Sequence, residues 1–236
     1  MNSVTLQDAT NLSFDQSQLA TTRSRTAARL SLFTAALFLV LLAVLHVIKP
    51  ELDPSWRMVS EYAIGDNGWL MSLAFLSLAL SCVSLVIALR WQVPTIGGKI
   101  GLGLFLVTAL GLTLAGIFKT DPITISPAAV TLSGNLHGLG ALLGLPTFPI
   151  AATLISLSLT RNKAWVASKR AYLWMLGLAW VSLVVFVTAM ATMFKGTFNP
   201  TVLIGWPNRL LMVTQCAWMM TVAWQMVRSN QQLGRK

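Results

Sequence analysis

Acidic residues are the scarcest charged groups in this chain of 236 residues, which contains seven Asp and Glu against 17 Lys and Arg. Charged residues make up 10 % of the sequence, whereas soluble domains carry about 25 %. Hydrophobic residues reach 55 %, so the composition excludes an ordinary soluble domain and predicts an integral membrane protein. The net charge of +10 does not indicate nucleic-acid binding, because the basic residues lie in short clusters between apolar runs.

Several chemical signatures are also missing. The only two cysteines, Cys82 and Cys216, lie within apolar runs, so no disulfide framework is expected. The HExxH zinc motif, the GxSxG nucleophile motif, the phosphate-binding loop and the dinucleotide-binding pattern do not occur. No charged residue falls at the predicted middle of the membrane, which argues against a proton-coupled pump or an ion pathway.

Six long apolar runs dominate the rest of the chain. The first rises about 28 Å as a helix, close to the thickness of about 30 Å of a hydrocarbon core. We therefore expect an all-α, polytopic membrane bundle of six transmembrane helices. The predicted spans are residues 30–48, 69–89, 100–117, 136–159, 171–193 and 210–227. Glycines four residues apart, such as Gly140 and Gly144, are typical of helices that pack closely in lipid.

The distribution of basic residues predicts the orientation. Twelve of the 17 Lys and Arg residues fall on the side of the bundle that carries both termini. The positive-inside rule then places both termini in the cytoplasm of a protein of the cell (inner) membrane. We expect residues 1–29 to form a mobile polar cytoplasmic tail, residues 30–228 the membrane domain, and residues 229–236 a second cytoplasmic tail.

One segment, residues 46–69, holds four of the seven acidic residues between the first two spans. Asp53 followed by Pro54 is typical of a helix start, and Gly65 of a helix end. We therefore expect a short amphipathic helix over residues 54–63 that lies at the outer membrane interface.

Arg57 and Glu61 stand four residues apart on this expected helix. They could form an ordinary surface ion pair, which contributes little to stability. Alternatively, Glu61 turns into the mouth of the bundle and takes part in a binding site.

Further polar residues reach the same predicted membrane depth. His46 ends the first span, Asp121 follows the third, His137 begins the fourth, and Asn208 and Arg209 open the last. Four of these residues have a structural alternative: the histidines could bond loop carbonyls, Asp121 could cap a turn, and Arg209 could extend to lipid headgroups.

Three stretches resemble a known family: PELDPSWRMVSEYAIGDNGWLM, GIFKTDP and TLSGNLHGLGALLG. They are similar to the DUF 998 family of bacterial and archaeal multi-span membrane proteins, whose biochemical role is unassigned. The resemblance covers the chain after its polar tail and implies a membrane fold and location, but no reaction. It assigns Glu61, Asp121 and His137 no role beyond their place in these motifs.

Three functional hypotheses follow. The first is a protein that binds or transfers a lipid or small amphiphile, without a cofactor, at an outward-facing polar pocket. The second is a membrane-embedded, metal-dependent lipid hydrolase, in which His46, His137, Asp121 and Glu61 would hold zinc. The third is a structural or assembly subunit without a ligand. The bilayer is the expected partner, and no oligomeric state is predicted. The candidate ligand-binding residues are Glu61, Asp121, His46, His137, Arg209, Arg57 and Asn208.

Overall fold

A computed structural model describes the backbone of residues 6–193 and 200–233, and the side chains of residues 22–191 and 200–228. The described chain is all α-helical and has no strands. Its six long helices are α1 Leu6–Ile48, α2 Trp69–Leu89, α3 Ile96–Ile117, α4 Leu132–Leu159, α5 Lys169–Met193 and α6 Gly205–Leu233. Three short 3₁₀ helices are η1 Val59–Ala63, η2 Pro127–Ala129 and η3 Lys163–Ser168.

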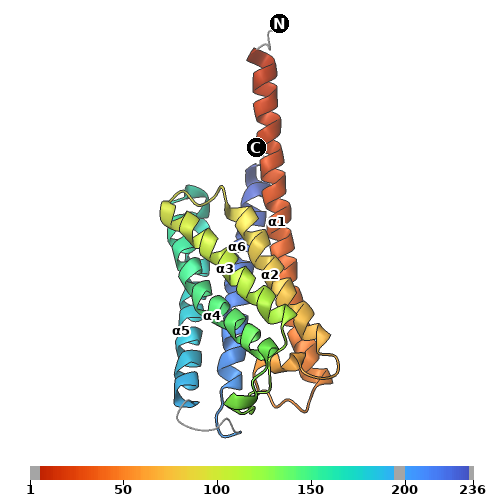
Figure 1. Ribbon diagram of the computed structural model, residues 1–236. Helices are drawn as coiled ribbons and strands as arrows, with labels where there is room; N and C mark the ends of the chain where they lie inside the picture. The colour runs from red at the N-terminus through yellow and green to blue at the C-terminus, as the bar shows by residue number, and fades with distance from the viewer. Residues whose placement is uncertain (1–5, 194–199, 234–236) are drawn as a thin grey trace.

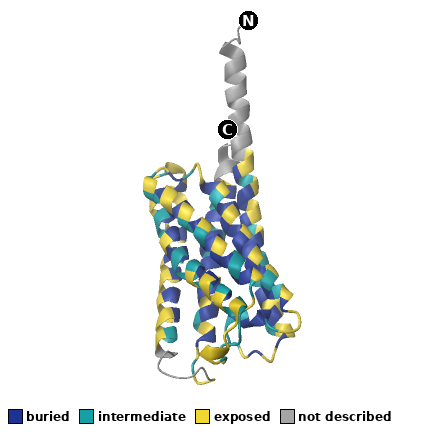
Figure 2. Cartoon of the chain, in the orientation of Figure 1, coloured by how far each residue is buried: buried dark blue, intermediate teal, exposed yellow. Residues whose placement is uncertain are grey.

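All six long helices are long and apolar enough to cross a membrane, which confirms the predicted fold class. They run side by side along one axis (Figure 1). Each packs on its neighbours in the chain, and α6 returns to pack on α1, so that the helices form a closed ring. The contact between α4 and α5 is the least extensive of these neighbouring contacts. Exposed residues lie on the outside of the bundle (Figure 2), and they include many large hydrophobic residues, which lipid would contact.

Only α2 begins at the first residue of its predicted span, and the other five long helices begin earlier. Side-chain caps account for two of these earlier starts. Thr95 caps α3 by accepting a hydrogen bond from the Gly98 N–H over 3.0 Å, and Thr131 caps α4 in the same way from Gly134 over 3.0 Å. The first turns that follow these caps contain glycine and polar residues, so hydropathy alone places the spans too late. The backbone of residues 6–29, which we expected as part of a polar tail, continues α1, and Ala27 and Ala28 are buried. The mobility of the tail stays a prediction.

The predicted interfacial helix over residues 54–63 is wrong in length and type. Only Val59–Ala63 is helical, as the 3₁₀ helix η1. Met58 before it is extended, with φ −75° and ψ 151°, and its N–H donates to Glu61 Oε2 over 2.9 Å. This bond holds the Glu61 carboxylate against the start of η1. The backbone before Met58 does not continue as an α-helix.

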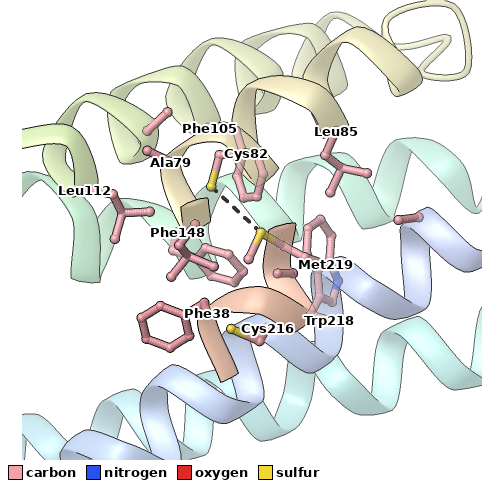
Figure 3. Packing of buried hydrophobic residues seen from close by; sticks show 14 of the residues in the cluster. Phe38, Ala79, Cys82, Leu85, Phe105, Leu112, Phe148, Cys216, Trp218 and Met219 are labelled. Carbon is pink, nitrogen blue, oxygen red and sulfur yellow. Dashed lines mark hydrogen bonds between the residues drawn. The ribbon is translucent and has the colours of Figure 1, made fainter. Parts of the chain in front are cut away.

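The core at the centre of the ring is aromatic and sulfur-rich. The rings of Phe105, Phe148 and Trp218 lie 5.3 to 5.8 Å apart between centroids. Cys82 on α2 contacts Met219 on α6 through sulfur atoms 3.7 Å apart (Figure 3). Both cysteines of the chain are buried and free. The α2, α3, α4 and α6 helices thus share one apolar core.

Candidate functional site

The segment between α1 and α2 folds back against the first turn of α6. The Gly205 N–H donates to the Ser55 carbonyl, and the Val59 N–H donates to Asn208 Oδ1, each over 2.9 Å. A Cβ atom at Gly205 would lie 2.3 Å from the Pro54 carbonyl oxygen, so only glycine allows this approach. The last span therefore anchors the loop that follows the first.

Arg209 is buried beside this loop, and four of its five N–H groups donate to protein groups. Its Nε donates to His46 Nε2 over 2.7 Å, and its Nη2 donates to the Tyr62 hydroxyl over 3.1 Å. Its Nη1 donates to the carbonyls of Arg57 and Gly205 over 2.7 and 3.1 Å. Arg209 thus joins α1, the η1 segment and α6, and it does not extend to lipid headgroups.

The tautomer of His46 follows from these contacts. Arginine can only donate, so His46 Nε2 is the acceptor of the bond from Arg209. His46 Nδ1 then carries the proton and donates to the Leu42 carbonyl over 2.7 Å. Both ring nitrogens are occupied, and His46 is uncharged in this arrangement.

Glu61 is buried, with 1 % of its surface exposed, so it turns inward as one of the two alternatives requires. Its Oε2 accepts the Met58 N–H and its Oε1 accepts the Ile123 N–H, each over 2.9 Å. Arg57 Nη1 lies 3.4 Å from Oε1, which makes an ion pair with a buried carboxylate. The same guanidinium lies 4.7 Å from the centre of the Trp56 ring. Glu61 therefore holds the loop after α3 against η1.

Asp121 organises the start of α4. Its Oδ2 accepts the Thr131 N–H over 2.8 Å, and its Oδ1 accepts the Thr131 hydroxyl over 3.0 Å. Gly134 packs against the same carboxylate, since a Cβ there would lie 2.0 Å from Oδ2. These contacts correspond to the turn-capping alternative for Asp121.

His137 lies on α4 and is buried against the end of α3. Its Nδ1 faces the carbonyls of Ala115 and Phe118 over 3.2 and 2.9 Å. The ring meets Phe75 edge-on at 5.9 Å between centroids. Because carbonyl oxygens only accept, Nδ1 carries the proton and donates to them. The imidazole thereby satisfies carbonyls at the C-terminal end of α3, as one of the alternatives for the histidines expects.

Two buried residues of this region are absent from the sequence-based candidates. Tyr62 bonds Arg209 and lies 5.1 Å from the His46 ring, measured between centroids. Lys49 is buried, and its ammonium donates to the carbonyls of Tyr62 and Ile64. A lysine directly after an apolar span usually marks a membrane boundary, so its sequence position alone does not indicate burial.

The candidate residues thus separate into local groups. His46 and Arg209 meet around Tyr62. The Arg57 carbonyl accepts from Arg209, and the Arg57 guanidinium pairs with Glu61. Asp121 and His137 make their own contacts near the ends of α3 and α4. No three His, Cys, Asp or Glu side chains among the described residues come together as metal ligands, so the zinc set of the hydrolase hypothesis is not assembled.

A cavity of about 520 Å³ lies beside these groups, between α2, α3, α4, α5, α6 and η1. This volume is within the range of about 300–1,000 Å³ that is usual for ligand pockets. Its walls are mainly apolar, with Phe75, Leu145, Leu183 and Phe186 among the lining residues. Of the candidate residues, His137 and Asn208 line it directly, and the others do not.

The polar side chains that line the cavity lie at one end of it, and its opening lies on one side of the bundle. Ser60, His137 and Asn208 all belong to the end of the bundle that carries η1. Leu142 on α4 and Val187 on α5 line the cavity and are also 70 % and 53 % exposed on the surface of the bundle. The cavity therefore opens sideways between α4 and α5, the neighbouring pair with the least contact.

Comparisons with known proteins identify a family, but this family has no assigned activity. A family model described as a protein of unknown function, DUF998, matches residues 19–225. No curated protein and no solved structure matches the chain.

Proposed function

The chain belongs to the DUF998 family of proteins of unknown function, and from its cavity we propose that it binds or transfers a lipid or small amphiphile in the membrane. One observation carries this proposal: the cavity has apolar walls, an opening between two spans, and polar side chains confined to one end. An amphiphile has the same distribution of apolar and polar groups. Its tail would enter between α4 and α5 and its head would lie beside η1.

The depth of the cavity is suited to a ligand from one leaflet. Its lining on α4 extends from His137 to Pro146. This stretch rises about 14 Å as a helix. That is roughly half of a hydrocarbon core of about 30 Å. A lipid already in that leaflet would reach the cavity by lateral movement, without crossing the membrane.

We propose different roles for the candidate residues. His137 and Asn208 line the cavity and would contact the ligand directly. Arg209, His46, Arg57 and Glu61 would hold η1 and its loop in place as one wall, since their polar atoms bond protein groups. Asp121 would hold the start of α4, which positions His137.

The membrane context belongs to the same proposal. Six apolar helices imply a multi-pass membrane protein. The excess of Lys and Arg on the side of both termini supports a cytoplasmic location for the termini in the cell (inner) membrane. In that orientation η1 and the polar end of the cavity face outward.

Filling the cavity tests the proposal. Gly138 lines the cavity, and a Cβ added there would meet nothing within 4 Å, so Gly138→Leu should occupy the space that the ligand uses. Gly177→Leu is the matched control, because Gly177 is also an exposed helical glycine with nothing within 4 Å, yet it does not line the cavity.

Native mass spectrometry of the purified full-length proteins would count retained amphiphiles. We expect Gly138→Leu to retain several-fold less than the wild type, and Gly177→Leu to retain the same amount. Ala141→Phe, at a second lining position, should act like Gly138→Leu. Equal retention by the wild type and both cavity-filling variants would overturn the proposal.

A further inference from the structure

The polar end of the cavity contains no charged side chain. Its polar lining residues are Ser60, His137 and Asn208. The guanidinium groups of Arg57 and Arg209 do not line the cavity. Arg209 is bonded to His46, Tyr62 and two carbonyls, and Arg57 is paired with Glu61. A ligand in the cavity would therefore meet neutral hydrogen-bonding groups.

His137 provides an acceptor. It is 94 % buried, since its relative exposure is 6 %, and its Nδ1–H donates to the carbonyls of Ala115 and Phe118. In the uncharged ring, Nε2 then holds a lone pair. This atom has no hydrogen-bond partner among residues 22–191 and 200–228.

Asn208 provides donors. Its relative exposure is 7 %, and its Oδ1 accepts the Val59 N–H, which fixes the orientation of the amide. The two N–H groups of its side chain make no hydrogen bond within the described side chains. Ser60 follows Val59, lines the cavity, and has a hydroxyl that is likewise unpaired within them.

We infer that the amphiphile has an uncharged head with a hydroxyl group, as in a long-chain alcohol or a diacylglycerol. The hydroxyl would donate to His137 Nε2 and accept from the Asn208 amide. This inference rests on the proposed function and assigns the class of ligand.

Physical reasons favour such a head over a charged one. Inside a bilayer, an apolar tail gains little by moving from lipid to an apolar wall, so the polar end must provide the selectivity. A phosphate or ammonium group would lose its hydration there and find no opposite charge, which is costly in a medium of low dielectric constant. A hydroxyl can pair both of its functions at much smaller cost.

Photolabelling with three matched probes tests this inference. Dodecanol, dodecyl phosphate and dodecylamine would each carry the same diazirine in the tail, and each would be added at neutral pH to the full-length protein in phosphatidylcholine nanodiscs. Mass spectrometry would map labelled residues in the cavity. We expect dodecanol to label the lining of α4 and α5 at concentrations about a hundredfold below those needed for the charged probes.

Two substitutions locate the contacts. His137→Asn keeps a donor near the Nδ1 position for the α3 carbonyls and removes Nε2, so dodecanol labelling should weaken about fivefold to tenfold. Asn208→Asp keeps an acceptor for the Val59 N–H and adds a negative charge, so it should increase labelling by dodecylamine. Ser133→Ala is a control near the same end of α4, because Ser133 bonds the Lys119 carbonyl and does not line the cavity.

The outcomes separate the two proposals. Equal labelling of the cavity by all three probes, or no change in the two variants, would overturn the neutral-head inference and leave amphiphile binding intact. Absence of cavity labelling by every probe would overturn the proposed function itself. Stronger labelling by dodecyl phosphate than by dodecanol would assign an anionic ligand instead.

Discussion

Arg209 is a buried cation whose hydrogen-bond partners are all uncharged. Among the described residues it makes no ion pair, and it lies in the first turns of α6, where the helix dipole disfavours positive charge. Carbonyl oxygens of Arg57 and Gly205, the Tyr62 hydroxyl and the His46 imidazole compensate for this. Such a group stabilises the protein only while every partner is in place.

Removal of this guanidinium should therefore destabilise the protein. Arg209→Met fills similar space but leaves His46 and Tyr62 without their partner, and we expect a loss of about 2–3 kcal/mol in the free energy of unfolding. Arg228→Met on the same helix is the control, since Arg228 is exposed and should change stability by less than about 0.5 kcal/mol. Denaturant unfolding in mixed micelles measures both. Equal losses in the two variants would contradict the role given to Arg209.

Glu61 gives a second prediction for a single residue. Its two oxygens accept N–H groups from Met58 and Ile123, so either orientation of a glutamine would place an NH₂ group against a backbone donor. We expect Glu61→Gln to cost about 1–3 kcal/mol in unfolding measured the same way. Asp66→Asn, at an exposed position of the same loop, should be neutral. A Glu61→Gln protein as stable as the wild type would show that these bonds are dispensable.

Among the helices, the packing of α3 on α4 depends on small residues. A Cβ at Gly140 would lie 2.6 Å from the Gly111 carbonyl oxygen, and one at Gly111 would lie 2.5 Å from the Gly140 carbonyl oxygen. The predicted close packing is thus found at both glycines, because a Cβ at Gly111 would also lie 2.7 Å from the Gly144 nitrogen. A Cβ on Gly144 itself would have more room, with its nearest neighbour 3.9 Å away. The contact brings the end of α3 to His137.

Alanine at this contact should force the helices apart. We expect Gly140→Ala to cost about 1–3 kcal/mol in the free energy of unfolding, because the obstructing atom is backbone and cannot rotate away. Gly103→Ala on α3 is the control: a Cβ there meets nothing within 4 Å, so helix propensity should make it neutral or slightly stabilising. Comparable destabilisation of both variants would contradict the packing role given to Gly140, because helix propensity favours alanine over glycine at both positions.

At the scale of the whole molecule, the orientation in the membrane can be measured directly. Asp66 and Arg161 are exposed, and both native cysteines are buried. Asp66 lies between α1 and α2 and Arg161 between α4 and α5, so the two residues lie at opposite ends of the bundle. In intact cells, a thiol reagent that cannot cross the membrane should label Asp66→Cys and spare Arg161→Cys. After the membrane is opened, both should react. Labelling of Arg161→Cys alone in intact cells would reverse the proposed topology.

The sequence predicts the bundle well because long apolar runs follow directly from the thickness of a bilayer. It predicts the helix starts less well, since Thr95 and Thr131 act through side-chain caps that hydropathy does not detect. It places His46 and Arg209 at one depth, yet their contact depends on helix rotation and on the η1 fold. Tyr62 has no sequence signal for its role, because an aromatic residue near an interface is usual.

The cavity is the least predictable feature. It results from how α5 packs against α4, and no residue pattern specifies a gap between two apolar helices. Most of the polar candidate residues that the sequence indicates hold the wall of the cavity in place and do not line it. Ser60 also lines the cavity, although no sequence motif marks it.

The attachment of the η1 segment to α6 also affects the order of biosynthesis. The Ser55 carbonyl, the Arg57 carbonyl and the Val59 N–H obtain their partners from Gly205, Arg209 and Asn208. Ribosomes deliver the chain from its N-terminal end, so these groups emerge long before their partners do. During insertion the ring of helices stays open on the α1 side, and the nascent loop must keep its polar backbone in water until the sixth span arrives. Packing of the last helix against α1 is then the step that closes the ring of helices.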